Sequence, residues 1–203
     1  MHLSYVREKT GHALAGARQW IPAEDIRDPV KSLVTGLPVS LRFRTKGQRA
    51  IDILHDAYGD GLALDFICGD EVYGSCTDLR EYLEGHGQAY VLRVASNFML
   101  TLAGATKMTC AEAVNKLLKA KKAWEVRSAG QGSKGERWYA WAWLATASRH
   151  HSLLVRRHLK SGELAFHYCF VPDGQLASKA RLIRAGSHPC VKYCSAYARM
   201  GMR

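Results

Sequence analysis

The segment Phe66–Val94 constrains the fold more than any other part of the sequence. A short apolar run, Leu62–Cys68, precedes a helix-like stretch, and a second apolar run, Ala89–Val94, follows it. Apolar runs of this length are typical of strands that are buried on both faces of a parallel sheet. Two such strands connected by a helix predict a βαβ unit with the strands parallel and adjacent.

Asp70 stands just past the predicted carboxyl end of the first strand, after Gly69. Open α/β sheets bind their ligands at this end of the strands. A carboxylate there can bind Mg²⁺, a hard cation that prefers oxygen ligands. Two-metal phosphoryl transfer requires several acids that converge on ions about 3.5–4 Å apart. From its spacing alone, Asp70 is equally well explained as the cap of the turn into the next helix.

The flanking sequence predicts an α/β fold with a mixed sheet (α+β). Leu3–Val6 and His12–Arg18 are the expected arms of an antiparallel hairpin, and Ile21–Pro38 is the expected loop because it carries three prolines and many polar residues. Thr45 is the expected N-cap of the following helix. The second half of the chain predicts an antiparallel meander, with strands at Trp138–Thr146, Ser152–Arg157 and Leu164–Val171.

The chain is basic: 29 Lys and Arg against 18 Asp and Glu give a net charge of +11 over 203 residues. A charge of this size favours a polyanionic partner, most often nucleic acid, and a basic surface without a dedicated partner is the alternative. No apolar run is long enough to span a membrane, and no secretory pattern opens the chain. We therefore expect a cytoplasmic protein with six reduced cysteines, and only a weak zinc case at His188, Cys190 and Cys194.

Four lysines are the candidate DNA contacts, because ammonium groups can neutralise phosphates: Lys119, Lys121, Lys122 and Lys134. The first three end a predicted basic amphipathic helix, Cys110–Ala123. A solvated helix face is the alternative explanation. Lys134 lies in a glycine-rich loop, Ser128–Glu136, that lacks the spacing of a phosphate-binding loop and is expected to be a hairpin tip.

A series of short motifs runs in order from Leu3 to Arg184. The central motif is GDEVYG at Gly69–Gly74, followed by LRxYLExxGxxYVLxV at Leu79–Val94. The other motifs are Gly11–Leu14, Trp20–Pro22, Phe43–Lys46, Ala123–Trp124, Ser128–Gly135, Leu153–Arg157 and Glu163–Tyr168. Together they resemble bacterial insertion-sequence transposases of the DDE class, of the insertion-sequence 701 type.

The resemblance implies a partial ribonuclease H-like core with a β-rich insertion. We expect the core at residues 1–94, the insertion at 95–173 and a C-terminal segment at 174–203. Enzymes of this kind use three acidic residues and two divalent ions, Mg²⁺, to cut the ends of the element and join them to target DNA. The resemblance makes Asp70 the second of these acids, which is both a catalytic residue and a metal ligand.

The other two acids of the family pattern are missing from their expected places. The first belongs on a strand upstream of Leu3. The third belongs soon after Ser187, in a Trp-x-Val/Ile-Glu-Glu context, where this chain has Lys192 or Tyr193, and Pro189 disfavours a helix. We therefore expect a transposase fragment that is truncated at both ends, degenerate after residue 187 through a shifted reading frame, and catalytically incomplete. A DNA-binding regulator without catalysis and a decayed reading frame are the alternatives, and the oligomeric state stays open.

Overall fold

A mixed β-sheet runs through the centre of the protein in the computed structural model, which describes residues 1–7, 11–132, 135–175, 177–187 and 194–197. The strands are β1 (His2–Arg7), β2 (Gly11–Ala17), β3 (Phe66–Gly69), β4 (Tyr90–Val94), β5 (Met99–Thr101), β6 (Lys107–Thr109), β7 (Glu125–Gly132), β8 (Gly135–Ala145), β9 (His151–His158), β10 (Leu164–Phe170) and β11 (Cys194–Tyr197). The helices are α1 (Ala23–Arg27), α2 (Pro29–Val34), α3 (Lys46–Gly59), α4 (Glu71–Gly74), α5 (Thr77–Gly85), α6 (Cys110–Leu117) and α7 (Lys179–Ser187), with the 3-10 turns η1 (Ala103–Ala105) and η2 (Lys121–Ala123).

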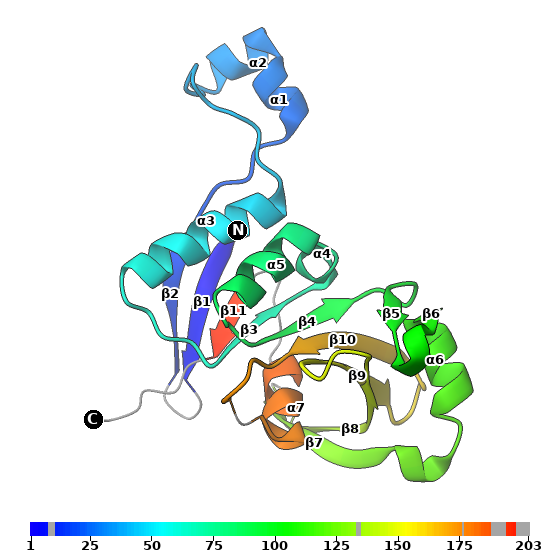
Figure 1. The fold of residues 1–203 in the computed structure, drawn as a ribbon. Coiled ribbons are helices and arrows are strands. Elements are labelled where there is room, and N and C mark those ends of the chain that lie inside the picture. Colours follow the sequence, from blue (N-terminus) through cyan, green and yellow to red (C-terminus); the bar gives the residue numbers. More distant parts are fainter. Residues whose placement is uncertain (8–10, 133–134, 176, 188–193, 198–203) are drawn as a thin grey trace.

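In the described part of the chain, nine strands form one sheet in the order β2-β1-β11-β3-β4-β10-β9-β8-β7. β3 and β4 are parallel, and β11 is parallel to β1 and antiparallel to β3. The neighbouring strands β4, β10, β9, β8 and β7 are antiparallel to one another in that order. The sheet curls at the end formed by β10, β9, β8 and β7 (Figure 1). This arrangement confirms the predicted α/β (α+β mixed sheet) class and is compatible with a ribonuclease H-like fold.

The predicted βαβ unit is confirmed, because β3 and β4 pair in parallel with Ile67 opposite Tyr90. Every residue of β3 is buried, which explains its uninterrupted apolar sequence. The strand begins at Phe66 and not at Leu62, since Gly61 turns the chain with a φ of 78° and the residues after it approach the sheet as a loop.

Helices cover both faces of this central unit. On one face, α3 and α5 pack against the sheet through Leu54 and Leu83, which contact the cluster around Ile67. On the other face, α7 packs through Leu182 and Ile183 against the alternate side chains of the same strands. Because successive strand residues point to opposite faces, β3 contributes to both cores at once.

The first helix of the core begins where the sequence predicts. The Thr45 hydroxyl accepts a hydrogen bond from the Gln48 backbone N–H at 3.2 Å, and the Gln48 side chain accepts one from the Thr45 N–H at 3.0 Å. This capping box satisfies two N–H groups that the helix cannot pair internally. The hairpin of β1 and β2 is confirmed as well.

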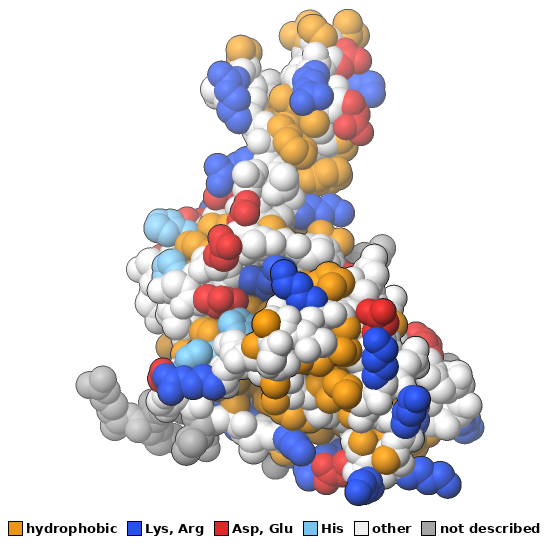
Figure 2. All heavy atoms as spheres, turned by 45° about the vertical axis from the view of Figure 1, so that its right-hand side comes forward, with side chains coloured by type: hydrophobic (Ala, Val, Ile, Leu, Met, Phe, Trp, Pro, Cys, Tyr) orange, Lys and Arg blue, Asp and Glu red, His pale blue; other side chains and the backbone are white. Residues whose placement is uncertain are grey.

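The loop predicted over Ile21–Pro38 is wrong, because this segment contains α1 and α2. The Asp28 carboxylate accepts hydrogen bonds from the backbone N–H groups of Val30 and Lys31. Pro29 occupies the first turn of α2, where a backbone N–H would have no partner within the helix, so its missing N–H costs nothing. The two helices project as an arm from the body of the protein (Figure 1), and Figure 2 shows hydrophobic side chains exposed on it. The exposed apolar residues of this region include Val30, Leu33, Val34 and Val39.

The antiparallel meander of the second half is confirmed as β8, β9 and β10. Trp141 is 2% exposed and packs with Tyr139 and Trp143 on one face, so these aromatic rings belong to the core, as their alternation predicts. The opposite face of the meander packs against α6.

Two boundaries in this half differ from the prediction. The helix expected over Cys110–Ala123 ends at Leu117, because Leu118 turns inward and its carbonyl accepts a hydrogen bond from the Trp124 indole at 2.8 Å. The glycine-rich segment Ser128–Glu136 forms the end of the β7–β8 hairpin, as predicted, but most of it is strand, since β7 continues to Gly132 and β8 begins at Gly135.

The sheet is continuous across the predicted boundary between the core at 1–94 and the insertion at 95–173, since β10 pairs directly with β4. The division into these segments and 174–203 stays a prediction. Among the described residues, no helix is both long and apolar enough to cross a membrane.

Candidate functional site

Asp70 lies at the carboxyl end of β3, at the first turn of α4. Its Oδ1 accepts a hydrogen bond from the Val72 backbone N–H at 3.0 Å, so it caps this short helix. The capping role that spacing alone allowed is therefore confirmed. Capping by Oδ1 leaves Oδ2 available for another partner, so this contact is compatible with a second role.

Two hollows meet at Asp70. The first is a pocket of about 180 Å³ between the ends of β3 and β4, the meander and the last turn of α7. The second is a wider groove of about 560 Å³ that Trp20 and Lys46 line from the other side. The Lys46 ammonium lies 5.0 Å from the centre of the Trp20 ring, a cation–π contact. Asp70 lines both hollows, so its carboxylate forms part of the wall between them.

Three arginines line the smaller pocket: Arg93 from β4, Arg137 from β8 and Arg156 from β9. The Arg93 Nε lies 3.1 Å from Glu71 Oε1, close enough for an ion pair but not aligned for a hydrogen bond. Arg137 donates to the carbonyl of Ser187 at 3.1 Å, and the Arg156 guanidinium lies 4.7 Å from the centre of the Tyr139 ring. Burial lowers the pKa of Arg156, and the positive charges of Arg93 and Arg137 lower it further.

His167 also lines this pocket, from β10. The residue is 5% exposed, and its Nδ1 has no hydrogen-bond partner among the described residues. Burial lowers the pKa of His167 to about 3, and the charges of Arg156 and Arg93 act in the same direction. The imidazole is therefore neutral at neutral pH, and hydrogen bonding to the backbone of Leu154 and Gly186 offsets the lowering only in part.

Strand register explains why these residues meet. His167 lies directly opposite Arg93 across β10 and β4, and it lies opposite Leu154 across β10 and β9. Arg156 is two residues beyond Leu154 and so shares its face. The face of the sheet that is apolar beneath α7 thus becomes cationic where the helix ends.

Comparison with known proteins identifies the family. The family model of the DDE superfamily endonucleases matches residues 1–138, which is more than half of the chain. The chain belongs to this family. None of the curated proteins matches the sequence. The match to the DDE superfamily endonucleases includes Asp70, Arg93 and Arg137 and ends within β8.

DDE superfamily endonucleases cut DNA and typically use divalent metal ions, so the residues around Asp70 can be tested for a fit. Among the described residues, no group of three or more His, Cys, Asp or Glu side chains is arranged to hold a metal ion. Asp70 is the one carboxylate among the residues that line the smaller pocket, beside three guanidinium groups. A hard dication needs several oxygen ligands and is repelled by such a cluster. These residues do not form an Mg²⁺ site, and the catalytic and metal-binding roles of Asp70 stay predictions.

The lysines predicted to contact DNA lie elsewhere on this DDE superfamily endonuclease. Lys119, Lys121 and Lys122 are exposed in the turn after α6, on the side of the molecule opposite β1 and β2 (Figure 1). Figure 2 shows Lys and Arg side chains scattered along the lower part of this face. Lys134 lies outside the described residues. None of these lysines lines the pockets at Asp70.

Neither the arginines nor His167 were identified as site residues from the sequence. The available signal was a charged residue inside an otherwise apolar strand, as in YVLRV around Arg93 and LLVRRH around Arg156. A charged residue in such a strand indicates a position whose side chain lies outside the hydrophobic core. The pairing register, which sequence alone does not supply, is needed to bring these positions together.

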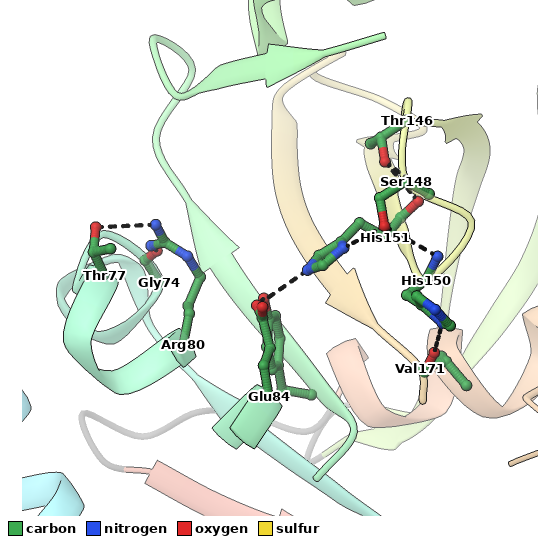
Figure 3. Close-up of polar contacts among 10 residues, drawn as sticks. Gly74, Thr77, Arg80, Glu84, Thr146, Ser148, His150, His151 and Val171 are labelled. Carbon is green, nitrogen blue, oxygen red and sulfur yellow. Dashed lines mark hydrogen bonds and ion pairs between the residues drawn. The ribbon is translucent and has the colours of Figure 1, made fainter. Parts of the chain in front are cut away.

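A second polar cluster lies between α5 and the β8–β9 turn, and Figure 3 shows Glu84 directed toward His151. Glu84 Oε1 lies 3.0 Å from His151 Nε2, and the same oxygen accepts a hydrogen bond from the Tyr90 hydroxyl at 2.6 Å. His151 Nδ1 is 2.9 Å from Ser148 Oγ. These groups satisfy one another, so we assign the cluster a structural role that ties α5 to β9.

Proposed function

We propose that this chain binds DNA as part of a transposase-type endonuclease and does not cleave DNA by itself. Membership of the DDE superfamily endonucleases supports the DNA substrate. The observation that carries the proposal is the juxtaposition of Asp70 with three arginines at the carboxyl end of β3. The order of motifs from Leu3 to Arg184 supports an origin in a bacterial insertion sequence, and a transposase of that kind acts on DNA in the cytoplasm.

The proposed lack of cleavage rests on the composition of the site. One carboxylate beside three guanidinium groups favours an anion over a dication. Lys192 and Tyr193, which occupy the place expected for the third acid, lie outside the described residues, and neither side chain is the carboxylate that the family pattern requires. A second polypeptide that supplies acids is compatible with this proposal.

Purified full-length chain tests both halves of the proposal with one labelled duplex. We expect binding in a gel-shift assay at low salt and no strand cleavage in the presence of Mg²⁺ or Mn²⁺. Asp70→Asn should leave binding within about twofold of the wild type, because the substitution removes one charge and keeps the cap oxygen. Asp60→Asn, an exposed acid after α3, is the matched control.

Either half can fail separately. Metal-dependent cleavage that Asp70→Asn abolishes and Asp60→Asn preserves would show that the site is complete and would overturn the proposed inactivity. Absence of DNA binding at low salt would overturn the proposed function as a whole.

A second candidate function is a DNA-binding regulator that has no endonuclease partner. This function requires only the surplus of arginine over acid at the site and assigns no role to the Asp70 carboxylate. Cleavage restored by an added full-length transposase of the same type, and dependent on Asp70, would favour the first function. Inhibition of that transposase by the chain, unaffected by Asp70→Asn, would favour the regulator.

A further inference from the structure

We propose that the pocket lined by Arg93, Arg137, Arg156 and His167 is a binding site for one phosphate group of a nucleic-acid strand. The pocket opens beside Asp70, at the carboxyl ends of β3 and β4. The identity of the strand as DNA rests on the proposed function, whereas the phosphate chemistry rests on the pocket itself.

The first argument is unbalanced charge. Asp70 and Glu71 are the carboxylates next to the three guanidinium groups, and Glu71 is paired with Arg93 alone. Glu163 attracts Arg156 without forming an ion pair with it. Among the described residues, Arg137 donates to carbonyl oxygens and Arg156 stacks near an aromatic ring, and neither forms an ion pair. Guanidinium groups held close together in this way repel each other, and a bound anion relieves that repulsion.

The second argument is unused hydrogen-bonding capacity. The Nε atom of Arg137 is buried and has no hydrogen-bond partner among the described residues, and the buried Nε of Arg93 has only its misaligned contact with Glu71. Buried donors without well-aligned acceptors are costly, so these two N–H groups beside one pocket favour a ligand that supplies acceptors. The neutral imidazole of His167 directs its one N–H to backbone, so His167 lines the pocket without adding to the positive charge.

The third argument is shape. A volume of about 180 Å³ is smaller than the roughly 300–1,000 Å³ of pockets that enclose drug-sized ligands, so a whole nucleotide does not fit inside. One tetrahedral phosphate, still attached to a strand that runs outside, fits such a space. The planar fork of arginine matches phosphate oxygens in pairs, which favours phosphate over a spherical anion such as chloride.

The test uses the full chain and two probes, inorganic phosphate and a short single-stranded oligonucleotide with or without a 5′-phosphate. Binding is measured by isothermal titration calorimetry at low ionic strength for the wild type and for Arg156→Gln. Arg157→Gln is the matched control, because it removes the same charge from the neighbouring residue of β9. Arg157 points to the opposite face of the sheet, where its guanidinium lies 4.0 Å from the centre of the Trp124 ring.

We expect Arg156→Gln to weaken the binding of inorganic phosphate by about tenfold or more, and Arg157→Gln to change it by less than about twofold. Equal weakening by the two variants would overturn the proposal, because phosphate binding would then depend on the net charge of the protein and not on contacts in the pocket. Absence of phosphate binding to the wild type would overturn it as well.

Folding of each variant is checked by urea unfolding. Arg93→Gln is the second variant, since the Arg93 side chain is 42% exposed and its removal disturbs the core least. If Arg156→Gln fails to fold, a tenfold loss of phosphate binding in folded Arg93→Gln supports the proposal. Unchanged binding in folded Arg93→Gln contradicts it.

The oligonucleotides separate the source of the phosphate. Tighter binding of the 5′-phosphorylated strand, lost in Arg156→Gln, identifies a strand end, whereas equal Arg156-dependent binding of both strands identifies an internal phosphodiester. If the wild type and the Arg156→Gln variant bind DNA equally well, the pocket proposal fails and the proposed function stands. If the pocket binds phosphate but the chain binds no DNA, the proposed function fails and the pocket stands.

Discussion

His167 is neutral in the folded protein because it is buried among arginines, with a pKa lowered to about 3 from the ordinary 6.5. Between these values the unfolded chain binds a proton that the folded chain does not, so the free energy of unfolding rises with pH through this window. We expect the wild type to lose about 2 kcal/mol of stability between about pH 7 and about pH 5 through this residue. Urea unfolding at the two pH values measures the loss.

His167→Gln removes the titrating group, so the variant should show a smaller decrease of stability over the same pH interval. His55, an exposed histidine on α3, supplies the control. His55→Gln should leave the pH dependence unchanged. Identical pH dependence in the wild type and His167→Gln would contradict the assignment of the effect to this side chain.

At the same scale, the sequence identified Asp70 but not the groups around it. Asp70 could be found because strand, glycine and acid are consecutive, and its local role as a cap follows from the same spacing. Arg93 on β4 is distant in sequence from Arg156 and His167, which lie on the consecutive strands β9 and β10. Their proximity depends on long-range pairing, which a charge pattern along one chain does not reveal.

Gly74 determines how closely α4 approaches β4. A Cβ atom at this position would lie 1.9 Å from the carbonyl oxygen of Arg93, which is backbone and cannot rotate away. We expect Gly74→Ala to lower the free energy of unfolding by about 3 kcal/mol or more, or to prevent folding. Circular dichroism of the purified variant, followed by urea unfolding, measures this effect.

Gly85, the last residue of α5, is the matched control because no atom of the rest of the described chain, outside the adjoining residues and helix backbone, lies within 4 Å of the Cβ that alanine would add there. Gly85→Ala should leave stability unchanged or raise it by up to about 1 kcal/mol, since alanine favours helix and restricts the unfolded chain. Equal stability of the two variants would show that α4 can move away from β4 at little cost.

Glu84 ties α5 to the sheet through Tyr90 and through His151, and Figure 3 shows its contact with His151. Glu84→Ala leaves the buried Tyr90 hydroxyl without its acceptor, so we expect a loss of about 1–3 kcal/mol in the free energy of unfolding. Glu81→Ala, one turn earlier and exposed, should change stability by less than about 0.5 kcal/mol. A loss of the same size in both variants would assign the effect to helix α5 in general.

The elements that the sequence predicts correctly have strong local signals. The N-cap at Thr45 and the strand predicted over Trp138–Thr146 are examples, because each depends on neighbours only a few residues away. The end of α6 could not be predicted, since the indole of Trp124 competes for the carbonyl of Leu118 and ends the helix early. The helices of the arm, α1 and α2, were not predicted, because the prolines indicate a loop although Asp28 is a good N-cap for a helix that begins at Pro29.

The whole molecule carries a net charge of +11, and its cationic side chains are spread over many elements. Two groups of them are candidate DNA contacts: the arginine pocket beside Asp70 and the exposed lysine turn after α6. The pocket lies on the face of the sheet that α7 covers, whereas α6 packs on the opposite face, so a single polyanion that reaches both groups must pass around the sheet. The two groups therefore make separable contributions to DNA binding, the first local and the second dependent mainly on net charge.

If Lys119, Lys121 and Lys122 each contact a phosphate, their removal lowers the salt dependence of DNA binding. Each contact adds about 0.9 to the slope of log K against log salt on duplex DNA, so replacing all three by Gln should reduce the slope by about 2–3. Fluorescence anisotropy at several salt concentrations measures the slope. The control variant replaces Lys31, Lys107 and Lys160 by Gln. These substitutions remove the same charge from three separate parts of the chain and should reduce the slope by less than about 1. Equal slopes in the two triple variants would mean that DNA responds to net charge alone and that the turn after α6 is an ordinary solvated surface.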